Sequence, residues 1–357
     1  MPESGAQART TGGLPPALIV SGPTASGKSA LALLLAERHR GTVINADSMQ
    51  VYRDLRVLTA RPSPQDEARV PHLLYGVRDA AEPADAAWFR SAGLAAMAEA
   101  RASERLPILC GGSGLWLEAL VRGICEIPAV PAEIRSRSRR LAAAIGAPAL
   151  HARLAERDPD TALTLRPSDT QRVTRAWEVL EATGRGLAAW WRAASHPPAQ
   201  YRFAHILLDP PRDRLRAAID ARFLAMLERG ALEEVRALLA RGLDPALPAM
   251  RAHGVLPLAA AILGKIPLAQ AVAEAQAQIR QYAKRQAAWF RHRPLAPPER
   301  TFIIRSWIGA GAQFSQSDMA DMFSFVDGFL LTPICPAGIR RARTTPRGAE
   351  AKEGQSR

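Results

Sequence analysis

The sequence predicts an α/β fold in which a parallel sheet is flanked by helices and carries an all-helical insertion domain. A glycine-rich loop at residues 22–29 lies between an apolar run and a helical pattern. Short apolar runs at residues 42–46 and 106–110 end in polar or glycine-rich residues, as buried parallel strands commonly do. From residue 128 to 199 the strand pattern gives way to Ala- and Arg-rich segments, which indicate the helical insertion.

The glycine-rich loop has the spacing of a phosphate-binding loop, and the run Leu18-Ile19-Val20 precedes it. Its glycines let backbone N–H groups surround an anion, and the following helix adds its dipole. Lys28 supplies a full charge, and Ser29 supplies a hydroxyl for Mg²⁺. A chance match would not need the flanking strand and helix, so we predict a P-loop NTPase-like, nucleotide-binding or ATP-binding type of core. The predicted phosphate- or diphosphate-binding residues are Gly22, Pro23, Thr24, Ala25, Ser26, Gly27, Lys28 and Ser29.

The second predicted strand, residues 42–46, ends in Asp47-Ser48-Met49-Gln50. Ligands of open α/β sheets bind at the carboxyl ends of strands, where Asp47 would lie. Its carboxylate could hold Mg²⁺, cap the next helix or act as a general base. Residues 59–62 and 71–74 are expected to be loops, and residues 88–101 form a helix with an apolar stripe.

The third predicted strand, residues 106–110, runs into Gly111-Gly112-Ser113-Gly114. Glycines and a hydroxyl at a strand end allow backbone and Oγ to approach a ligand closely, although a tight turn would need the same residues. The phosphate loop, Asp47 and Ser113 all follow strands of one sheet. They are therefore expected to lie at one edge of it.

The predicted helical insertion carries an excess of arginine without a matching acidic run. Arg135 belongs to a basic stretch that could equally be a solvated helix face. Residues 166–175 add three arginines with amide and hydroxyl groups, and Arg172 and Arg175 share a helix face. Such a set suits a phosphate backbone or an unstacked base. Strand propensity returns at residues 205–209.

Helices are predicted for most of residues 212–291. Arg222 lies between apolar stripe positions and could reach the nucleotide pocket or pack its stem at the surface. Arg251-Ala252-His253-Gly254 is a glycine-containing turn. In the last predicted helix, 269–291, basic residues alternate with aromatic ones, a pattern that suits a nucleic-acid strand as well as core packing. Beyond residue 297 we expect a divergent, partly disordered tail, residues 298–357.

Composition favours a polyanionic partner. The 357 residues carry a net charge of +13, which makes nucleic acid the first candidate, although an arginine-biased genome would give the same sign. The three cysteines, Cys110, Cys125 and Cys335, have no metal-ligand spacing, so a reducing, cytoplasmic location is expected. No apolar run is long enough to span a membrane. Residues 1–13 are expected to be a disordered lead-in without a signal-peptide core.

Taken together, the motifs resemble the tRNA dimethylallyltransferase (tRNA isopentenyltransferase) family, bacterial enzymes that modify adenosine 37. The resemblance runs in order from about residue 18 to about residue 294. Besides the phosphate loop it is carried by Asp47-Ser48, Gln50-Val51-Tyr52, Thr59-Ala60, Pro71-His72, Gly111-Gly112-Ser113-Gly114-Leu115, Asp169, Gln171-Arg172, Arg175-Ala176, Glu178-Val179, Arg222, Met226, Gln281-Tyr282-Ala283-Lys284-Arg285-Gln286 and Trp289-Phe290-Arg291. Two departures are Ser113, where the family usually has Thr, and Val255, where it usually has Tyr after Gly254.

The resemblance implies transfer of a dimethylallyl group from dimethylallyl diphosphate to N6 of adenosine 37, in tRNAs that read codons beginning with U. It implies Mg²⁺ as cofactor, a tRNA anticodon stem-loop as partner, and a monomer. Residues 14–127 and 200–297 would form the catalytic core and residues 128–199 the tRNA-binding insertion. Asp47, Ser113 and Arg222 would be catalytic, with Ser29 at the metal. The implied tRNA-binding residues are Asp47, Ser48, Met49, Gln50, Ser113, Arg135, Gln171, Arg172, Val173, Thr174, Arg175, Arg251, His253, Gly254, Lys284 and Arg285.

Three other functions share part of the pattern. A small-molecule P-loop kinase would use the loop, Mg²⁺ and the strand-end Asp47 with ATP, but leaves the Arg-rich insertion unexplained. An isopentenyltransferase acting on free AMP would share the core chemistry and would not need the insertion. A non-catalytic RNA-binding protein would explain the charge, but not the combination of Lys28, Ser29 and Asp47.

Overall fold

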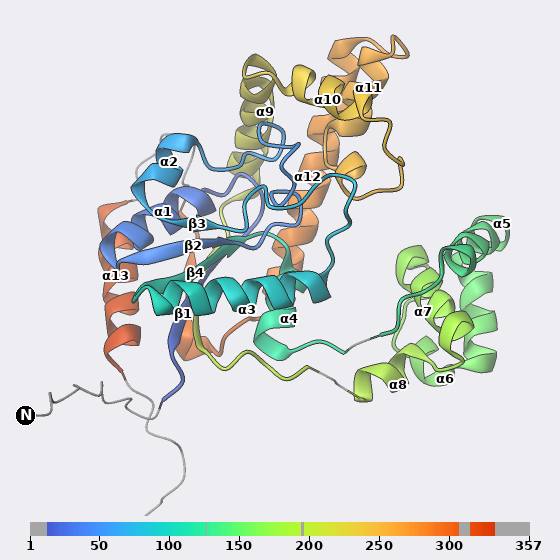
Figure 1. The fold of residues 1–357 in the computed structure, drawn as a ribbon, viewed down its shortest axis with the longest axis horizontal. Coiled ribbons are helices and arrows are strands. Elements are labelled where there is room, and N and C mark those ends of the chain that lie inside the picture. The colour runs from blue at the N-terminus through green and yellow to red at the C-terminus, as the bar shows by residue number, and fades with distance from the viewer. Residues whose placement is uncertain (1–12, 126, 194–195, 307–314, 333–357) are drawn as a thin grey trace, which may run out of the picture.

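The computed structural model describes residues 13–125, 127–193, 196–306 and 315–332. Within these residues a six-stranded parallel sheet has the order β3-β2-β4-β1-β5-β6 (Figure 1). Its strands are β1 Pro16–Ser21, β2 Gly41–Asn45, β3 His72–Leu73, β4 Leu106–Gly111, β5 Arg202–Leu208 and β6 Thr301–Ile304. Because β1 lies between β4 and β5, the loop that follows it emerges at the middle of the sheet edge.

Helices cover both faces of the sheet. The sequence of β1 is continuously apolar because both faces of this strand are buried. Ala17 and Ile19 point into one core with α3, α4 and α9 to α12, whereas Leu18 and Val20 point into a second core with α1 and α13. The helices are α1 Lys28–Arg38, α2 Pro64–Arg69, α3 Ala86–Ala102, α4 Gly114–Arg122, α9 Arg212–Glu228, α10 Ala231–Ala240, α11 Val255–Ile262, α12 Leu268–His292 and α13 Gln316–Leu331, with short 3₁₀ turns η1 Ala249–Arg251 and η2 Pro298–Arg300.

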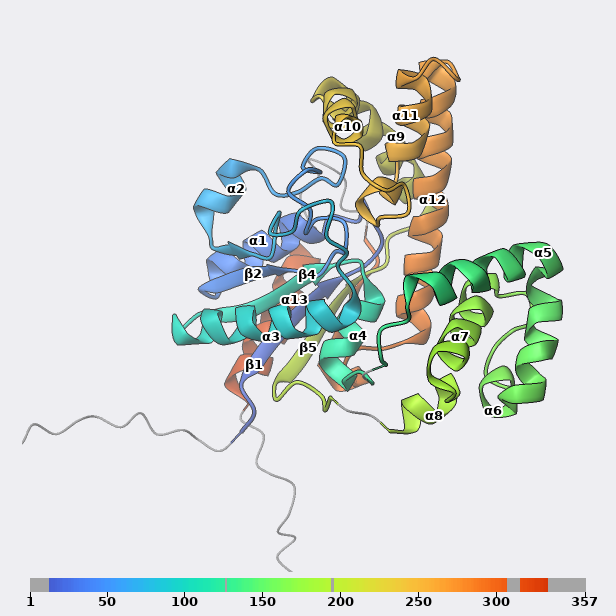
Figure 2. The same cartoon turned by 45° about the vertical axis from the view of Figure 1, so that its right-hand side comes forward.

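Four helices within residues 128–199 lie to one side of the sheet, beyond α4 (Figures 1 and 2). They are α5 Ala132–Arg157, α6 Pro159–Ala162, α7 Thr170–Thr183 and α8 Leu187–Arg192. Leu150, Leu154 and Val179 belong to a hydrophobic cluster whose members all lie within residues 127–190. The two connecting segments meet at an antiparallel bridge between Ile124 and His196. The helices therefore have their own core and are joined to the sheet through paired connections.

One expectation about secondary structure is wrong. The segment 71–74, expected to be a loop, contains the short edge strand β3, which pairs with β2. In the segment 298–357, expected to be a divergent, partly disordered tail, the described residues include two ordered elements: β6 pairs with β5, and α13 covers the sheet. Met322, Val326 and Phe329 are buried at helical spacing, which explains why this apolar piece forms a core helix rather than a tail. Residues 1–12 of the expected lead-in and 333–357 of the tail lie outside the described residues.

None of the helices in the described ranges is long and apolar enough to cross a membrane.

Candidate active site

The phosphate loop joins β1 to α1 and adopts a backbone that few residues allow. Gly22 has φ 147°, and a Cβ built on it would lie 2.5 Å from the carbonyl oxygen of Leu208 on β5. Gly27, at the N-terminus of α1, has φ 91°. These two positions therefore require glycine. The first N–H groups of α1 have no partner within the helix, which leaves them available to an anion.

Lys28 folds back over the loop. Its Nζ donates a hydrogen bond to the carbonyl oxygen of Pro23 at 2.7 Å. Although part of the side chain remains accessible, desolvation of the ammonium lowers its pKa to about 8, opposed by the nearby Cys110 and Asp47 and assisted by Arg222. A cation held in this way gains a partner when an anion enters the loop.

Arg222 reaches the same loop from α9, and its Nη2 donates to the Thr24 hydroxyl. Burial lowers its pKa to about 10, while the charge of Asp47 opposes the shift. Arg222 is therefore charged at neutral pH and contacts the loop at Thr24. This contact agrees with the prediction that Arg222 points back to the nucleotide pocket. It does not merely pack its stem at the surface.

Asp47 lies two residues beyond the end of β2, within electrostatic reach of Lys28 and Arg222. Its Oδ1 accepts from the N–H of Met49 at 2.9 Å, and its own N–H donates to Asn45 Oδ1 at 2.8 Å. One carboxylate oxygen thus closes a turn of its own loop. The turn fixes the carboxylate within electrostatic reach of the two cations.

Ser113 follows β4 and lies beside the Asp47 loop. Its Oγ accepts from the backbone N–H of Ser48 at 2.9 Å and donates to the Ser48 hydroxyl at 3.2 Å. In the structure its bond runs to the neighbouring Ser48, because the N–H of Ser113 is tied to Ala46 and turns the side chain toward residue 48.

Two residues of α12 complete the site, and sequence reasoning did not include them among the site residues. Gln286 is buried and contacts both Thr24 and Gly112. The Tyr282 hydroxyl interacts with Ser113 and Gln286, and burial raises its pKa, so the phenol is neutral. The signal available in the sequence was their spacing, since residues 282 and 286 lie one helical turn apart on one face.

The predicted tRNA-binding residues of the core lie in several different places. The rings of His253 and Tyr282 are in tilted contact with centroids 4.5 Å apart, and the Arg285 guanidinium carbon lies 5.7 Å from the Tyr282 ring centroid. Gly254 is at a turn with φ 95°. Gln50 is committed to its own loop, because its Nε2 donates to the carbonyl oxygens of Thr59 and Ala60.

Lys284 faces a different groove, of about 420 Å³, between α9 and α12. The groove reaches the phosphate loop at Pro23 and is lined by several basic side chains. Two of them are paired in salt bridges: Arg280 with Asp220 at 2.5 Å and Arg291 with Asp209 at 2.8 Å. Arg251 is exposed at the far end of the turn before α11.

The predicted tRNA-binding residues of the insertion lie on α5 and α7. Gln171 and Arg172 are exposed, and Arg135 is exposed on the first turn of α5. Val173 is fully buried in the insertion core and Thr174 is 8% exposed. Val173 packs in the hydrophobic cluster of the insertion, and both side chains are therefore covered by protein in this structure.

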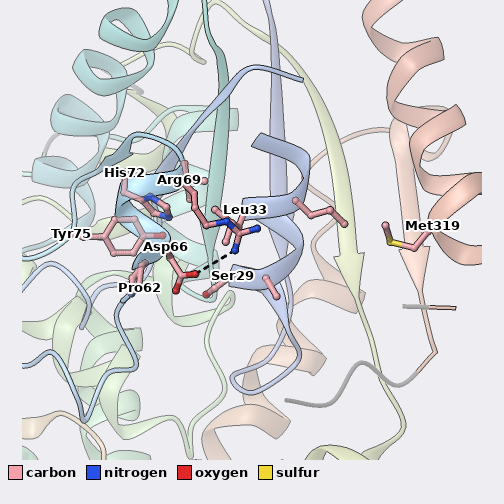
Figure 3. A pocket seen from close by; sticks show the side chains of 11 residues that line it. Ser29, Leu33, Pro62, Asp66, Arg69, His72, Tyr75 and Met319 are labelled. Atoms are coloured by element: carbon pink, nitrogen blue, oxygen red, sulfur yellow. Dashed lines mark ion pairs between the residues drawn. The ribbon is translucent and has the colours of Figure 1, made fainter. Parts of the chain in front are cut away.

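A separate cavity of about 560 Å³ lies on the other side of α1, between α2, β3 and α13 (Figure 3). It is mainly apolar, with Leu33 and Met319 on its walls and the ion pair Asp66–Arg69 at its rim. Ser29 is the phosphate-loop residue that lines it. Near Ser29 lies the buried Cys110 thiol, whose pKa burial raises to about 11.

Comparison with known proteins identifies the family of this chain. A family model described as IPP transferase matches residues 50–293. A tRNA dimethylallyltransferase of Gluconobacter oxydans is 57% identical over 311 residues, covering 87% of this chain and 93% of the relative. One of Granulibacter bethesdensis is 54% identical over 314 residues, covering 88% and 98%.

Solved structures give the same picture. The full-length tRNA isopentenylpyrophosphate transferase of Bacillus halodurans has 30% identity and a TM-score of 0.62, covering 88% of this chain and 96% of that one. A eukaryotic dimethylallyltransferase acting on tRNA has a TM-score of 0.70 at 23% identity, covering 88% and 80%, which supports the fold. By sequence and by fold, the chain belongs to the tRNA dimethylallyltransferase family of prenyl-transferring enzymes.

Proposed function

We propose that this chain transfers a dimethylallyl group from dimethylallyl diphosphate to N6 of adenosine 37 in tRNAs that read codons beginning with U. The products are N6-isopentenyladenosine and diphosphate. The observation that carries the proposal is the position of the Asp47 carboxylate, which lies within electrostatic reach of both Lys28 and Arg222 at the phosphate loop. A diphosphate site and a proton acceptor are thereby combined at one sheet edge.

The phosphate loop would hold the donor. The N–H groups at the start of α1, with Lys28 and Arg222, face the place where diphosphate charge grows as the allylic C–O bond breaks. The allylic carbon becomes cationic as that bond lengthens, so stabilising the leaving diphosphate lowers the barrier. The Lys28 ammonium donates to the Pro23 carbonyl oxygen in the free protein, and it would gain the diphosphate as an anionic partner.

Asp47 would act on the acceptor. The exocyclic amine of adenine is a poor nucleophile, since its lone pair is delocalised into the ring. As the N6–carbon bond forms, one N6 proton passes to the Asp47 carboxylate, and the electron pair of the broken C–O bond leaves with the diphosphate. Ser113 would orient the amine through its hydroxyl, which Ser48 holds in place at 2.9 Å.

The residues present fit a Mg²⁺ ion at Ser29. In the described part of the chain, no group of three or more His, Cys, Asp or Glu side chains is arranged to hold a metal. Mg²⁺ commonly uses one or two protein oxygens together with substrate phosphates and water, which the Ser29 hydroxyl at the start of α1 can satisfy. When bound, the ion neutralises charge on the diphosphate.

Adenosine 37 must leave its stack to reach Asp47, and the arginine-rich helices α5 and α7 supply charge for holding the anticodon stem-loop. We propose residues 14–127 and 200–297 as the catalytic core and residues 128–199 as the tRNA-binding domain, with α13 and β6 as an additional cover of the core. One chain carries the donor and acceptor sides of the site, which supports a monomer. Its free thiols Cys110 and Cys125 support a cytoplasmic location.

The test is a transfer assay with purified protein, Mg²⁺ and dimethylallyl diphosphate. Unmodified tRNA and AMP are offered separately, and the nucleosides are analysed by mass spectrometry. Isopentenyladenosine from tRNA alone supports the proposal. Product from AMP would indicate the free-nucleotide reaction, and phosphate transfer from ATP without prenyl transfer would indicate a kinase. Either result would overturn the proposal.

A further inference from the structure

Gln286 of α12 makes two hydrogen bonds that join separate parts of the site. The backbone N–H of Thr24 donates to Gln286 Oε1 at 2.8 Å, and Gln286 Nε2 donates to the carbonyl oxygen of Gly112 at 2.9 Å. The side chain is 4% exposed. Its orientation is fixed by chemistry, because a backbone N–H can only donate and a carbonyl can only accept.

The two partners belong to opposite sides of the proposed reaction. Thr24 lies in the phosphate loop, where its hydroxyl is also held by Arg222. Gly112 directly precedes Ser113, which belongs to the acceptor side. One amide group therefore spans the distance between the donor loop and the acceptor residues.

The contact leaves little room for adjustment. A Cβ built on Gly112 would lie 2.1 Å from Gln286 Nε2, so the backbone of the β4–α4 loop approaches the amide as closely as glycine allows. One turn earlier on α12, the Tyr282 hydroxyl interacts with both Gln286 and Ser113. Gln286 is thus restrained from three directions.

We infer that Gln286 is a positioning residue that sets the spacing between the diphosphate loop and the acceptor side of the site. This inference rests on the proposed function. The amide does not titrate and so cannot act as the acid or base, and its oxygen and nitrogen are hydrogen-bonded to Thr24 and Gly112. Its contribution is the geometry of attack, where a displacement of about 1 Å can lower a rate on the order of 100-fold.

Gln286→Met tests the inference, because Met has a similar length and makes neither hydrogen bond. We expect kcat to fall about 10- to 100-fold, with KM for dimethylallyl diphosphate and for tRNA changing less than about threefold. Gln278→Met is the matched control, since Gln278 is exposed on the same helix. It should keep wild-type kcat. Thermal unfolding of each variant sets an assay temperature at which all are folded.

Gln286→Glu provides a second variant if Met at this position prevents folding. A carboxylate still accepts from the Thr24 N–H but cannot donate to Gly112, so the donor loop keeps its contact and the acceptor side loses it. We expect dimethylallyl diphosphate to bind and turnover to fall.

The two possible failures are distinguishable. If the wild-type protein and Gln278→Met transfer the prenyl group and the folded Gln286 variants do so with unchanged kcat, the amide has only a structural role and the inference is wrong. If the wild-type protein transfers no prenyl group to tRNA, the proposed function fails, and the inference fails with it.

Discussion

Lys28 Nζ and the carbonyl oxygen of Pro23 are joined by a 2.7 Å hydrogen bond across the phosphate loop that contains both residues. Burial desolvates this ammonium, and this is the largest cause that lowers its pKa to about 8. The free protein therefore holds a cation that loses its proton more easily than an ordinary lysine does. An entering diphosphate would favour the charged form and reverse the shift.

The first prediction is proton uptake when the donor binds. Below about pH 8 Lys28 is charged in the free and bound protein, whereas at about pH 9 the free protein has lost most of this proton and binding must restore it. The affinity for dimethylallyl diphosphate should therefore fall with rising pH above about 8. Calorimetry in two buffers of different ionisation enthalpy measures the uptake. Lys28→Met should show weak binding without it, and pH-independent affinity of the wild-type protein would contradict the prediction.

The second prediction concerns Asp47→Asn. An asparagine Oδ1 can still accept from the N–H of Met49, so the loop should keep its turn, but the amide cannot take the N6 proton. We expect tRNA binding to be retained and kcat to fall about 100- to 10,000-fold. Asp244→Asn is the control, since exposed Asp244 accepts from the N–H of Ala246, two residues further on, in the same way. Single-turnover assays with preformed tRNA complex measure the chemical step, and a decrease of only a few-fold would exclude Asp47 as the general base.

The phosphate loop and the strand-end residues were predictable because their signals are local. Eight consecutive residues carry the spacing of the loop. Asp47 directly follows one apolar run, and Ser113 follows another after two glycines. The strands β3 and β6 carry too little local signal: β3 has two residues, and β6 becomes a strand by pairing Phe302 with Ile206, almost 100 positions away. Their formation depends on the assembled sheet.

Gln286 shows the same limit within the site. Its motif was recognised as part of a family pattern, but its role depends on Thr24 and Gly112, which lie far from it in sequence. Likewise Val173 belongs to a polar, basic motif that suggested RNA contact. Only the packing of α7 against α5 shows that its side chain is in a core. Residue type indicated the chemistry, while tertiary structure decided which side chains can perform it.

The third prediction uses the close approach at Gly112. Gly112→Ala would place a Cβ 2.1 Å from Gln286 Nε2 and must displace the amide or the loop. We expect it to lower kcat in the same way as Gln286→Met. In a double-mutant cycle the two changes should be clearly non-additive, because both act on one contact.

Gly328→Ala is the matched glycine control for that experiment. A Cβ at Gly328, within α13, meets no atom within 4 Å. The change should leave kcat unaltered and stabilise the protein by about 0.5–1 kcal/mol, since Ala is the better helix former. If Gly112→Ala also keeps wild-type kcat, the spacing at this contact does not limit the reaction.

The fourth prediction separates tRNA recognition from chemistry through Arg172. This side chain is 65% exposed on α7 and pairs only loosely with Asp169, at 3.4 Å, so its removal should cost the fold little. Arg172→Ala should raise KM for tRNA and lower the salt dependence of tRNA binding by about one unit of log–log slope, with kcat and KM for dimethylallyl diphosphate unchanged.

Arg192→Ala is the control: Arg192 is 66% exposed on α8 and paired with Asp160, and it is not among the predicted tRNA-binding residues. Filter binding at several salt concentrations, with steady-state kinetics, measures both effects. An Arg172→Ala enzyme that behaves like Arg192→Ala would mean that this end of α7 does not contact tRNA, because an arginine at a phosphate cannot be lost without weaker and less salt-dependent binding.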